Sequence, residues 1–259
     1  MISPLAYVDK EARIGANVTI HPFAYIDKNV EIGDNCTIMP YASILSGTRM
    51  GTDNIIYQGA IIGATPQDFK FKGEDTLLKI GNHNTIREKV ILNRGTNTTD
   101  CTIIGDGNFL LEGVHLAHDT HLGSHCVLGN GAKTAGNCII DDKAILGSEV
   151  IVKHGCRIGS WALLRDGCRA NKDVPPYIVA AHNPISYYGI NALILAKEGH
   201  LTENVIDNIA KCYRQIYQCG TSLENALRRI KDIIPLSPEI TYLVDFIEQS
   251  KKGIIGPTM

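Results

Sequence analysis

The sequence predicts an all-β fold, a parallel β-helix, followed by a small bundle of α-helices. Three observations predict it: an aliphatic residue at almost every sixth position, a compact residue four positions after it, and a pair of prolines where the pattern ends. A period of six fits neither an α-helix nor the alternation of an ordinary strand. It is typical of a coil of short strands, each of which supplies one large inward side chain.

The aliphatic period covers residues 2–62, 80–92 and 104–164. Thr134 is the one polar member of the last run. Five of the eight cysteines occupy the compact position, where we expect them to act as small buried side chains rather than as disulfide partners. They are Cys36, Cys126, Cys138, Cys156 and Cys168.

Two stretches interrupt the period, residues 64–79 and 93–103. Loops of this length in so regular a scaffold are more often functional than accidental. We therefore expect both loops to take part in the function of the protein.

The coil ends at Pro175 and Pro176, because two adjacent prolines cannot continue a ladder of strands. The residues that follow predict four helices. These are Tyr188–Lys197, a second from Thr202 to about Gln218, a third from Leu223 to about Asp232 with a capping box of Thr221 and Glu224, and a fourth from Ser237 and Pro238 to about Ser250. We expect a β-helix domain over residues 1–186 and a helical domain over residues 187–259.

Composition argues against several classes of partner. The formal net charge of −2 gives no general reason to expect nucleic acid. No apolar run approaches the ~20 residues that would span a membrane, and the first residues lack the basic and apolar pattern of a signal peptide. We therefore expect a cytoplasmic protein.

Four of the nine histidines crowd into one part of the last run. If three six-residue steps complete one coil, residues 18 apart stack on the same face. This spacing places His118, Gly136 and His154 in one column, and Asp119 under Asn137. The scaffold would then hold a histidine, a glycine and a second histidine side by side.

His118 is the candidate for acid–base chemistry. An imidazole suits general-base catalysis because its pKa in water, about 6.5, lies near cellular pH. Asp119 would fix the tautomer of the ring if a turn brings the two adjacent side chains together; otherwise a backbone carbonyl would orient the ring. The backbone N–H near Gly136 would stabilise an oxyanion.

The clustered histidines suggest a metal site, and nearby basic residues suggest a site that binds an anion. A step of three scatters His115, His118 and His121 over different faces and corners, whereas zinc needs its ligands at one point. We therefore expect no metal. A basic bias near the end of the coil suits an acidic partner or a phosphate-bearing substrate. Its members are Lys153, Arg157, Arg165, Arg169 and Lys172.

Several motifs together resemble one family over essentially the whole chain. They are V-H-L-A-H-D from Val114, T-A-G from Thr134, D-V-P-P-Y from Asp173, Q-D-F-K-F-K-G-E from Gln67 and N-R-G-T from Asn93. With the period and the helical tail, they are similar to the UDP-N-acetylglucosamine O-acyltransferases of lipid A biosynthesis. The resemblance implies a left-handed coil and a homotrimer with active sites in the clefts between subunits.

The resemblance also implies an activity, the transfer of an (R)-3-hydroxyacyl chain from acyl carrier protein to the 3-hydroxyl of UDP-N-acetylglucosamine. No cofactor is implied, because the acyl group arrives on the phosphopantetheine of the carrier protein. His118 matches the general base, Asp119 the acid that orients it, and Gly136 the backbone donor to the oxyanion. The expected substrate-binding residues are Gln67, Asp68, Lys70, His115, Asn137, Lys153, His154 and Asn191, of which Asn137 and Lys153 stand where the family often has histidine.

Other functions on the same scaffold stay open at this point. Sugar N-acyltransferases carry an additional N-terminal domain, for which a repeat beginning at Ile2 leaves no room. Acetyl-CoA-dependent acetyltransferases share the repeat without the V-H-L-A-H-D context. A zinc enzyme of the carbonic anhydrase type would contain bound metal. A non-catalytic scaffold would tolerate the loss of His118.

Overall fold

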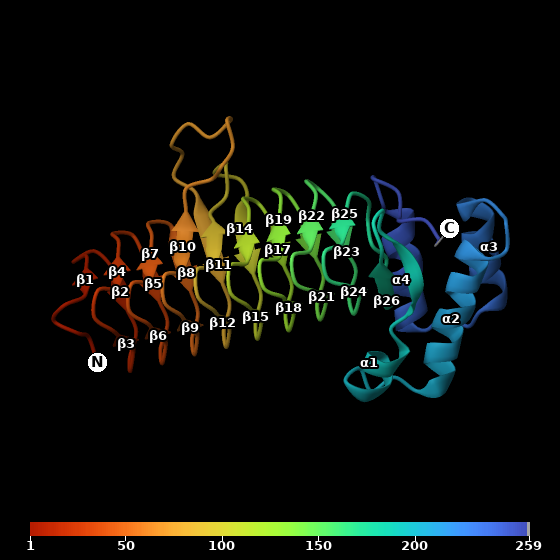
Figure 1. Cartoon of the computed structure of the whole chain (residues 1–259), viewed down its shortest axis with the longest axis horizontal. Coiled ribbons are helices and arrows are strands. Elements are labelled where there is room, and N and C mark those ends of the chain that lie inside the picture. Colours follow the sequence, from red (N-terminus) through yellow and green to blue (C-terminus); the bar gives the residue numbers. More distant parts are fainter. Residues whose placement is uncertain (258–259) are drawn as a thin grey trace.

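The computed structural model describes residues 1–257, as a long coil of short strands with four helices at its C-terminal end (Figure 1). Each complete turn of the coil adds one strand to each of three sheets. Neighbouring strands are parallel throughout the coil, and only the last described pair, β26 (Ile178–Ala181) with β27 (Ser186–Ile190), is antiparallel. The parallel β-helix predicted from the period of six is confirmed.

The three sheets run along the length of the coil. Sheet 1 contains β1 (Tyr7–Val8), β4 (Tyr25–Ile26), β7 (Ser43–Ile44), β10 (Ile61–Ala64), β13 (Ile91–Asn93), β16 (His115–Leu116), β19 (Lys133–Thr134), β22 (Ile151–Val152) and β25 (Arg169–Ala170). Sheet 2 contains β2 (Arg13–Ile14), β5 (Glu31–Ile32), β8 (Thr48–Met50), β11 (Leu77–Ile80), β14 (Cys101–Ile104), β17 (His121–Leu122), β20 (Ile139–Ile140) and β23 (Arg157–Ile158). Sheet 3 contains β3 (Thr19–Ile20), β6 (Thr37–Ile38), β9 (Ile55–Ile56), β12 (Thr85–Ile86), β15 (Phe109–Leu110), β18 (Val127–Leu128), β21 (Ile145–Leu146), β24 (Leu163–Leu164), β26 and β27.

The second residue of each two-residue strand points into the coil, and these residues form the core. Ile20, Ile38 and Leu110 are among those with no exposed surface. The compact residues at the corners are also buried, including all five cysteines expected there. Burial raises the pKa of the Cys126 and Cys138 thiols to about 12, so they remain protonated and act as small apolar side chains.

Coils stack with a spacing of 18 residues, as in the hydrogen bond from Arg13 to Glu31. The spacing is longer where Ile61 pairs with Ile91, and where Ile91 pairs with His115. The additional residues form two loops. The loops cover residues 65–76 and 94–100, so both are shorter than predicted because the flanking strands continue into the expected loop ends.

Four helices follow the coil: α1 (Ala192–Lys197), α2 (Glu203–Tyr217), α3 (Leu223–Ile233) and α4 (Pro238–Glu248). The helix starts predicted at Thr202 and Ser237 are confirmed, because each side chain caps its helix by accepting a hydrogen bond from a backbone N–H in the first turn. The cap predicted at Thr221 is wrong by one residue. Ser222 forms it instead, by accepting from the Asn225 N–H.

The first predicted helix is also partly wrong, because residues up to Ile190 form strand β27 and α1 is short. Pairing with β26 outweighs local helix propensity here, and Tyr187 of β27 stacks on Tyr213 and Tyr217 of α2. β27 begins at Ser186, the last residue of the predicted first domain, and the boundary at 186 stays a prediction. Within residues 1–257, no helix is both long and apolar enough to cross a membrane.

Candidate active site

His118 lies at the corner where β16 of sheet 1 passes into β17 of sheet 2. The next residue, Asp119, has a φ of 57°, a left-handed conformation that Asp adopts at lower cost than most residues. This conformation provides the turn that the pairing of adjacent side chains requires. The Nδ1 atom of His118 lies 2.8 Å from Oδ2 of Asp119, and both residues are largely buried.

Asp119 is fixed by hydrogen bonds from both sides. Its carboxylate accepts the Thr96 backbone N–H at 3.0 Å and the Thr96 hydroxyl at 2.6 Å, and its own N–H donates to Thr102 Oγ1 at 2.9 Å. Burial alone would raise the pKa of Asp119. The hydrogen bonds from Thr96 and His118 outweigh burial and lower this pKa below its ordinary value.

An anionic Asp119 determines the tautomer of His118. A carboxylate can only accept, so Nδ1 of the ring carries the proton and Nε2 keeps its lone pair. Nε2 faces the loop of residues 65–76, where Oδ2 of Asp68 lies 3.9 Å away. The imidazole ring therefore presents its basic Nε2 to the 65–76 loop, while the Asp119 carboxylate binds Nδ1 on the other side of the ring.

Gly136 stacks on His118, as the 18-residue spacing predicted. The Asn137 N–H donates to the His118 carbonyl at 3.0 Å, and the Gly155 N–H donates to the Gly136 carbonyl at 3.1 Å. A Cβ at Gly136 would collide with the His118 ring. Within residues 1–257 the Gly136 N–H has no hydrogen-bond acceptor, so it remains available to a ligand.

His115 has a different environment from His118. Its Nε2 lies 2.7 Å from Oδ1 of Asn93, whose amide nitrogen donates to the Thr65 carbonyl at 2.8 Å. Burial, and secondly the positive charge of Lys133, lower the pKa of His115. His115 is therefore a neutral side chain near pH 7, attached through Asn93 to the start of the 65–76 loop.

The 65–76 loop carries three of the expected substrate-binding residues. Asp68 is half-buried and accepts the Lys70 backbone N–H at 2.9 Å, while the side chains of Gln67 and Lys70 are exposed. Arg94, the first residue of the 94–100 loop, donates to Thr76 Oγ1 at the end of the 65–76 loop at 3.2 Å. Of these residues, Asp68 is the one that approaches His118.

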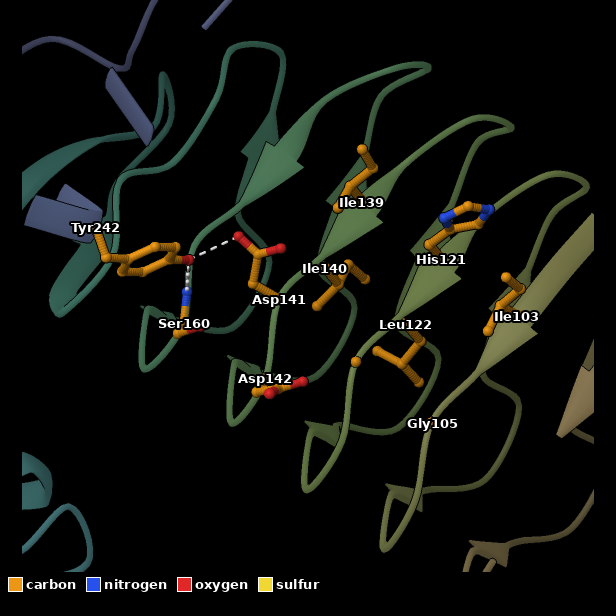
Figure 2. Close-up of a pocket in the computed structure, with 11 residues that line it drawn as sticks. Ile103, Gly105, His121, Leu122, Ile139, Ile140, Asp141, Asp142, Ser160 and Tyr242 are labelled. Atoms are coloured by element: carbon orange, nitrogen blue, oxygen red, sulfur yellow. Dashed lines mark hydrogen bonds between the residues drawn. The ribbon is translucent and has the colours of Figure 1, made fainter. Parts of the chain in front are cut away.

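The three histidines that raised the question of zinc lie apart, as predicted. His115 is on sheet 1, His118 at the corner and His121 on sheet 2. No group of three or more potential metal ligands occurs among residues 1–257. His121 instead lines an open groove of about 460 Å³ on sheet 2, which extends to Tyr242 of α4 and does not include His118 (Figure 2).

Family models, curated relatives and solved structures all match the chain to the same family. Residues 173–255 match the family described as UDP N-acetylglucosamine O-acyltransferase, domain 2, and residues 11–40, 29–64 and 101–136 match the bacterial transferase hexapeptide family. The chain is 44% identical over 255 residues to the acyl-[acyl-carrier-protein]–UDP-N-acetylglucosamine O-acyltransferase of Halorhodospira halophila, covering 98% of both proteins. It is 39% identical to the protein of the same name from Thermodesulfovibrio yellowstonii, covering 98% of this chain and 96% of the relative.

The chain belongs to the UDP-N-acetylglucosamine O-acyltransferase family. A solved UDP-N-acetylglucosamine acyltransferase from Bacteroides fragilis superposes on it with a TM-score of 0.96 at 51% identity, covering 98% of this chain and 100% of that one. Coils of opposite hand do not superpose in this way, and the left-handed coil expected of the O-acyltransferase fold is confirmed. The chain is an acyltransferase.

The chain does not bring every expected residue of the O-acyltransferase site to His118. Asn137, Lys153 and His154 are exposed along the same corner. Asn191 is buried at the start of α1, where its side-chain amide donates to the Trp161 carbonyl at 3.1 Å. Trp161 lies at the corner between sheets 2 and 3, so Asn191 does not join His118 within one chain.

Sequence reasoning missed the residues that hydrogen-bond to Asp119 and His115 of this O-acyltransferase site. Thr96 and Thr102 each bond to Asp119, and Asn93 bonds to His115. The N-R-G-T motif at Asn93–Thr96 was the available signal, but it lies in an interruption of the period. The 18-residue stacking rule therefore could not place these residues.

Proposed function

We propose that the chain transfers an (R)-3-hydroxyacyl chain from acyl carrier protein to the 3-hydroxyl of UDP-N-acetylglucosamine, the first step of lipid A biosynthesis. His118 is the general base in this proposal. The observation that carries it is the bond between His118 Nδ1 and the Asp119 carboxylate, which leaves Nε2 basic and directed towards the 65–76 loop.

The proposed reaction is a direct transfer. Nε2 of His118 removes the proton of the sugar hydroxyl while the oxygen attacks the carbonyl carbon of the thioester. The Gly136 N–H donates to the oxyanion of the tetrahedral intermediate. The carbon–sulfur bond then breaks, and the leaving thiolate takes the proton from the His118 imidazolium. The acyl chain arrives on the phosphopantetheine of the carrier protein, and the protein itself uses no cofactor.

Substrate binding follows from the charges around this corner. Gln67, Asp68 and Lys70 of the loop contact the nucleotide sugar in this proposal, and His115 lines the cleft beside them. Asn137, Lys153 and His154 extend the same corner towards the helical domain, with the lysine available to a phosphate.

We further propose that the enzyme is a cytoplasmic homotrimer. The outward residues of sheet 3 include Phe109, Ile145 and Leu163, and those of sheet 2 combine charged residues such as Arg13 and Glu31 with Ile103 and Ile139. Outward residues of sheet 1 include apolar side chains as well: Ile61, Ile91 and Ile151. A closed ring uses two different patches on each subunit, and sheets 1 and 3 supply such a pair. The cleft beside His118 would then receive Asn191 from a neighbouring subunit.

The experiment is acyl transfer from 3-hydroxyacyl carrier proteins of several chain lengths to UDP-N-acetylglucosamine. His118→Asn is compared with His125→Asn, an exposed corner position with a φ of 58° that Asn tolerates. We expect a loss of ~10²–10⁴-fold for His118→Asn and almost none for the control. Absence of transfer by the wild type with every chain length would overturn the function, and an active His118→Asn would overturn the base.

A further inference from the structure

The loop of residues 94–100 places Thr96 in contact with Asp119, the residue next to His118. Apart from this loop and the 65–76 loop, the coil passes from sheet 1 to sheet 2 by a short corner, as between β16 and β17. The insertion ends at β14, whose Thr102 accepts the Asp119 N–H at 2.9 Å. One threonine within the loop and one in the strand that follows it therefore contact the same aspartate.

Thr96 uses both of its polar groups on Asp119. The backbone N–H donates to Oδ1 at 3.0 Å, and the hydroxyl donates to Oδ2 at 2.6 Å. Oδ2 is also the atom that receives His118 Nδ1–H at 2.8 Å. The threonine hydroxyl and the imidazole therefore share one oxygen, so the hydroxyl limits where that oxygen can lie and, through it, how the ring can turn.

Close packing at Gly95 explains how the loop reaches this position. A Cβ at Gly95 would lie 3.0 Å from Asp119 Oδ1, from the Asp100 carbonyl oxygen and from Cys101 Cα. These approaches are tighter than ordinary carbon contacts. A residue without a side chain at 95 therefore allows the backbone to pass under the carboxylate and to present the Thr96 N–H to it.

We propose that Thr96 is a positioning residue of the transfer reaction, acting through Asp119 to hold the His118 ring in its reactive tautomer and orientation. The proposal rests on the proposed function of His118 as general base. Thr96 itself touches neither reacting atom in this scheme. Its effect should therefore appear in the rate of the chemical step, not in substrate affinity.

The surroundings of Asp119 include three titratable groups, His118, Asp68 and Cys101. His118 lies at the same corner, and Oδ2 of Asp68 in the 65–76 loop lies 3.9 Å from the His118 Nε2. The negative charge of Asp119 contributes to raising the pKa of the Cys101 thiol in β14. The Thr96 hydroxyl is among the groups that lower the Asp119 pKa. Removing it should raise that pKa and weaken the hold of the carboxylate on the Nδ1–H of His118.

The test compares Thr96→Val, which keeps the shape and the backbone N–H but loses the hydroxyl, with Thr96→Ser, which restores it. Thr98→Val, at an exposed position of the same loop, is the matched control. For Thr96→Val we expect about a tenfold or greater fall in kcat, since a hydrogen bond to a charged group is lost, with little change in either KM. Thr96→Ser should recover most of the rate, and Thr98→Val should match the wild type.

The kcat and KM of Thr96→Val and the activity of the wild type separate the two ways of failing. If the wild type transfers acyl chains and Thr96→Val retains its kcat, the positioning role is overturned while the function stands. A rise in KM at constant kcat would also overturn it, because that result indicates a binding role. Absence of transfer by the wild type would overturn the proposed function itself.

Discussion

Gly136 lies so close to His118 that a Cβ on the glycine would be 2.5 Å from Nε2 of the imidazole. The two residues stack across one coil, and the Asn137 N–H holds the layers together by donating to the His118 carbonyl. The imidazole therefore occupies the volume that any side chain at position 136 would need.

Gly136→Ala should place a methyl group in that volume and turn the ring away from Asp119. A displacement of about 1 Å in a reacting group costs roughly 10²-fold in rate, so kcat should fall by about that factor. Circular dichroism and the thermal midpoint check that the coil persists. Gly256→Ala, where a Cβ would meet nothing within 4 Å, is the control. Wild-type activity in Gly136→Ala would contradict the proposed role of His118 Nε2.

Asp119→Asn should reduce kcat by about 10⁴-fold, the size of effect seen when an amide replaces the acid that orients a catalytic histidine. The amide can present its N–H₂ to Nδ1 and stabilise the wrong tautomer. KM for both substrates should change much less than kcat. An Asp119→Asn enzyme within tenfold of the wild type would show that the carboxylate is not needed to select the tautomer.

The same substitution has a signature in stability against pH. The folded-state pKa of Asp119 is lowered, so the carboxylate contributes stability above its unfolded value of about 3.9 and loses it as pH falls through the folded pKa. The gap in thermal midpoint between wild type and Asp119→Asn should therefore narrow as pH falls below about 4. A gap that widens on acidification would contradict the lowered pKa.

His115 should also cost stability as pH falls, but in a higher pH range. Its folded pKa is lowered, so below about 6.5 the unfolded chain binds a proton that the folded chain does not. The free energy of unfolding of the wild type relative to His115→Gln should therefore fall between pH 7.5 and 5.5, as measured by urea titration. Lys133→Met should reduce the fall, because Lys133 contributes to the shift. A constant difference over this range would count against a neutral, buried His115.

The fold and the column of His118, Gly136 and His154 could be predicted from the sequence, because both follow from the six-residue period. Once three steps make a coil, Gly136 must stack on His118. The pairing of His118 with Asp119 could be predicted only conditionally, since the deciding turn is a backbone conformation of Asp119.

The remaining features of the fold and the site depend on contacts that the six-residue period does not predict. Thr96 bonds to Asp119 from an insertion whose path is set by close packing at Gly95. Tyr188 was expected in a helix, but pairing between β27 and β26 overrides its neighbours' helix propensity. These are tertiary effects, and they coincide with the places where the period lapses.

Tyr242 of α4 joins the helical domain to the coil, and its hydroxyl should contribute measurably to stability. It donates to Asp141 Oδ2 at 2.7 Å and accepts the Ser160 N–H at 2.9 Å, as Figure 2 shows. Tyr242→Phe would leave the Ser160 N–H and one carboxylate oxygen without this partner in a half-buried place. The cost should be about 1–3 kcal/mol, seen as a lower midpoint in urea.

Tyr41→Phe is the matched control for this hydroxyl, because Tyr41 is 64% exposed and its ring stacks on Phe23 without needing the oxygen. Its midpoint should stay at the wild-type value. The polar contact of Tyr242 lies in the groove lined by His121, not at the His118 corner. Tyr242→Phe should therefore keep its kcat at 25 °C, and loss of activity without loss of stability would show that the helical domain acts on the site through α4.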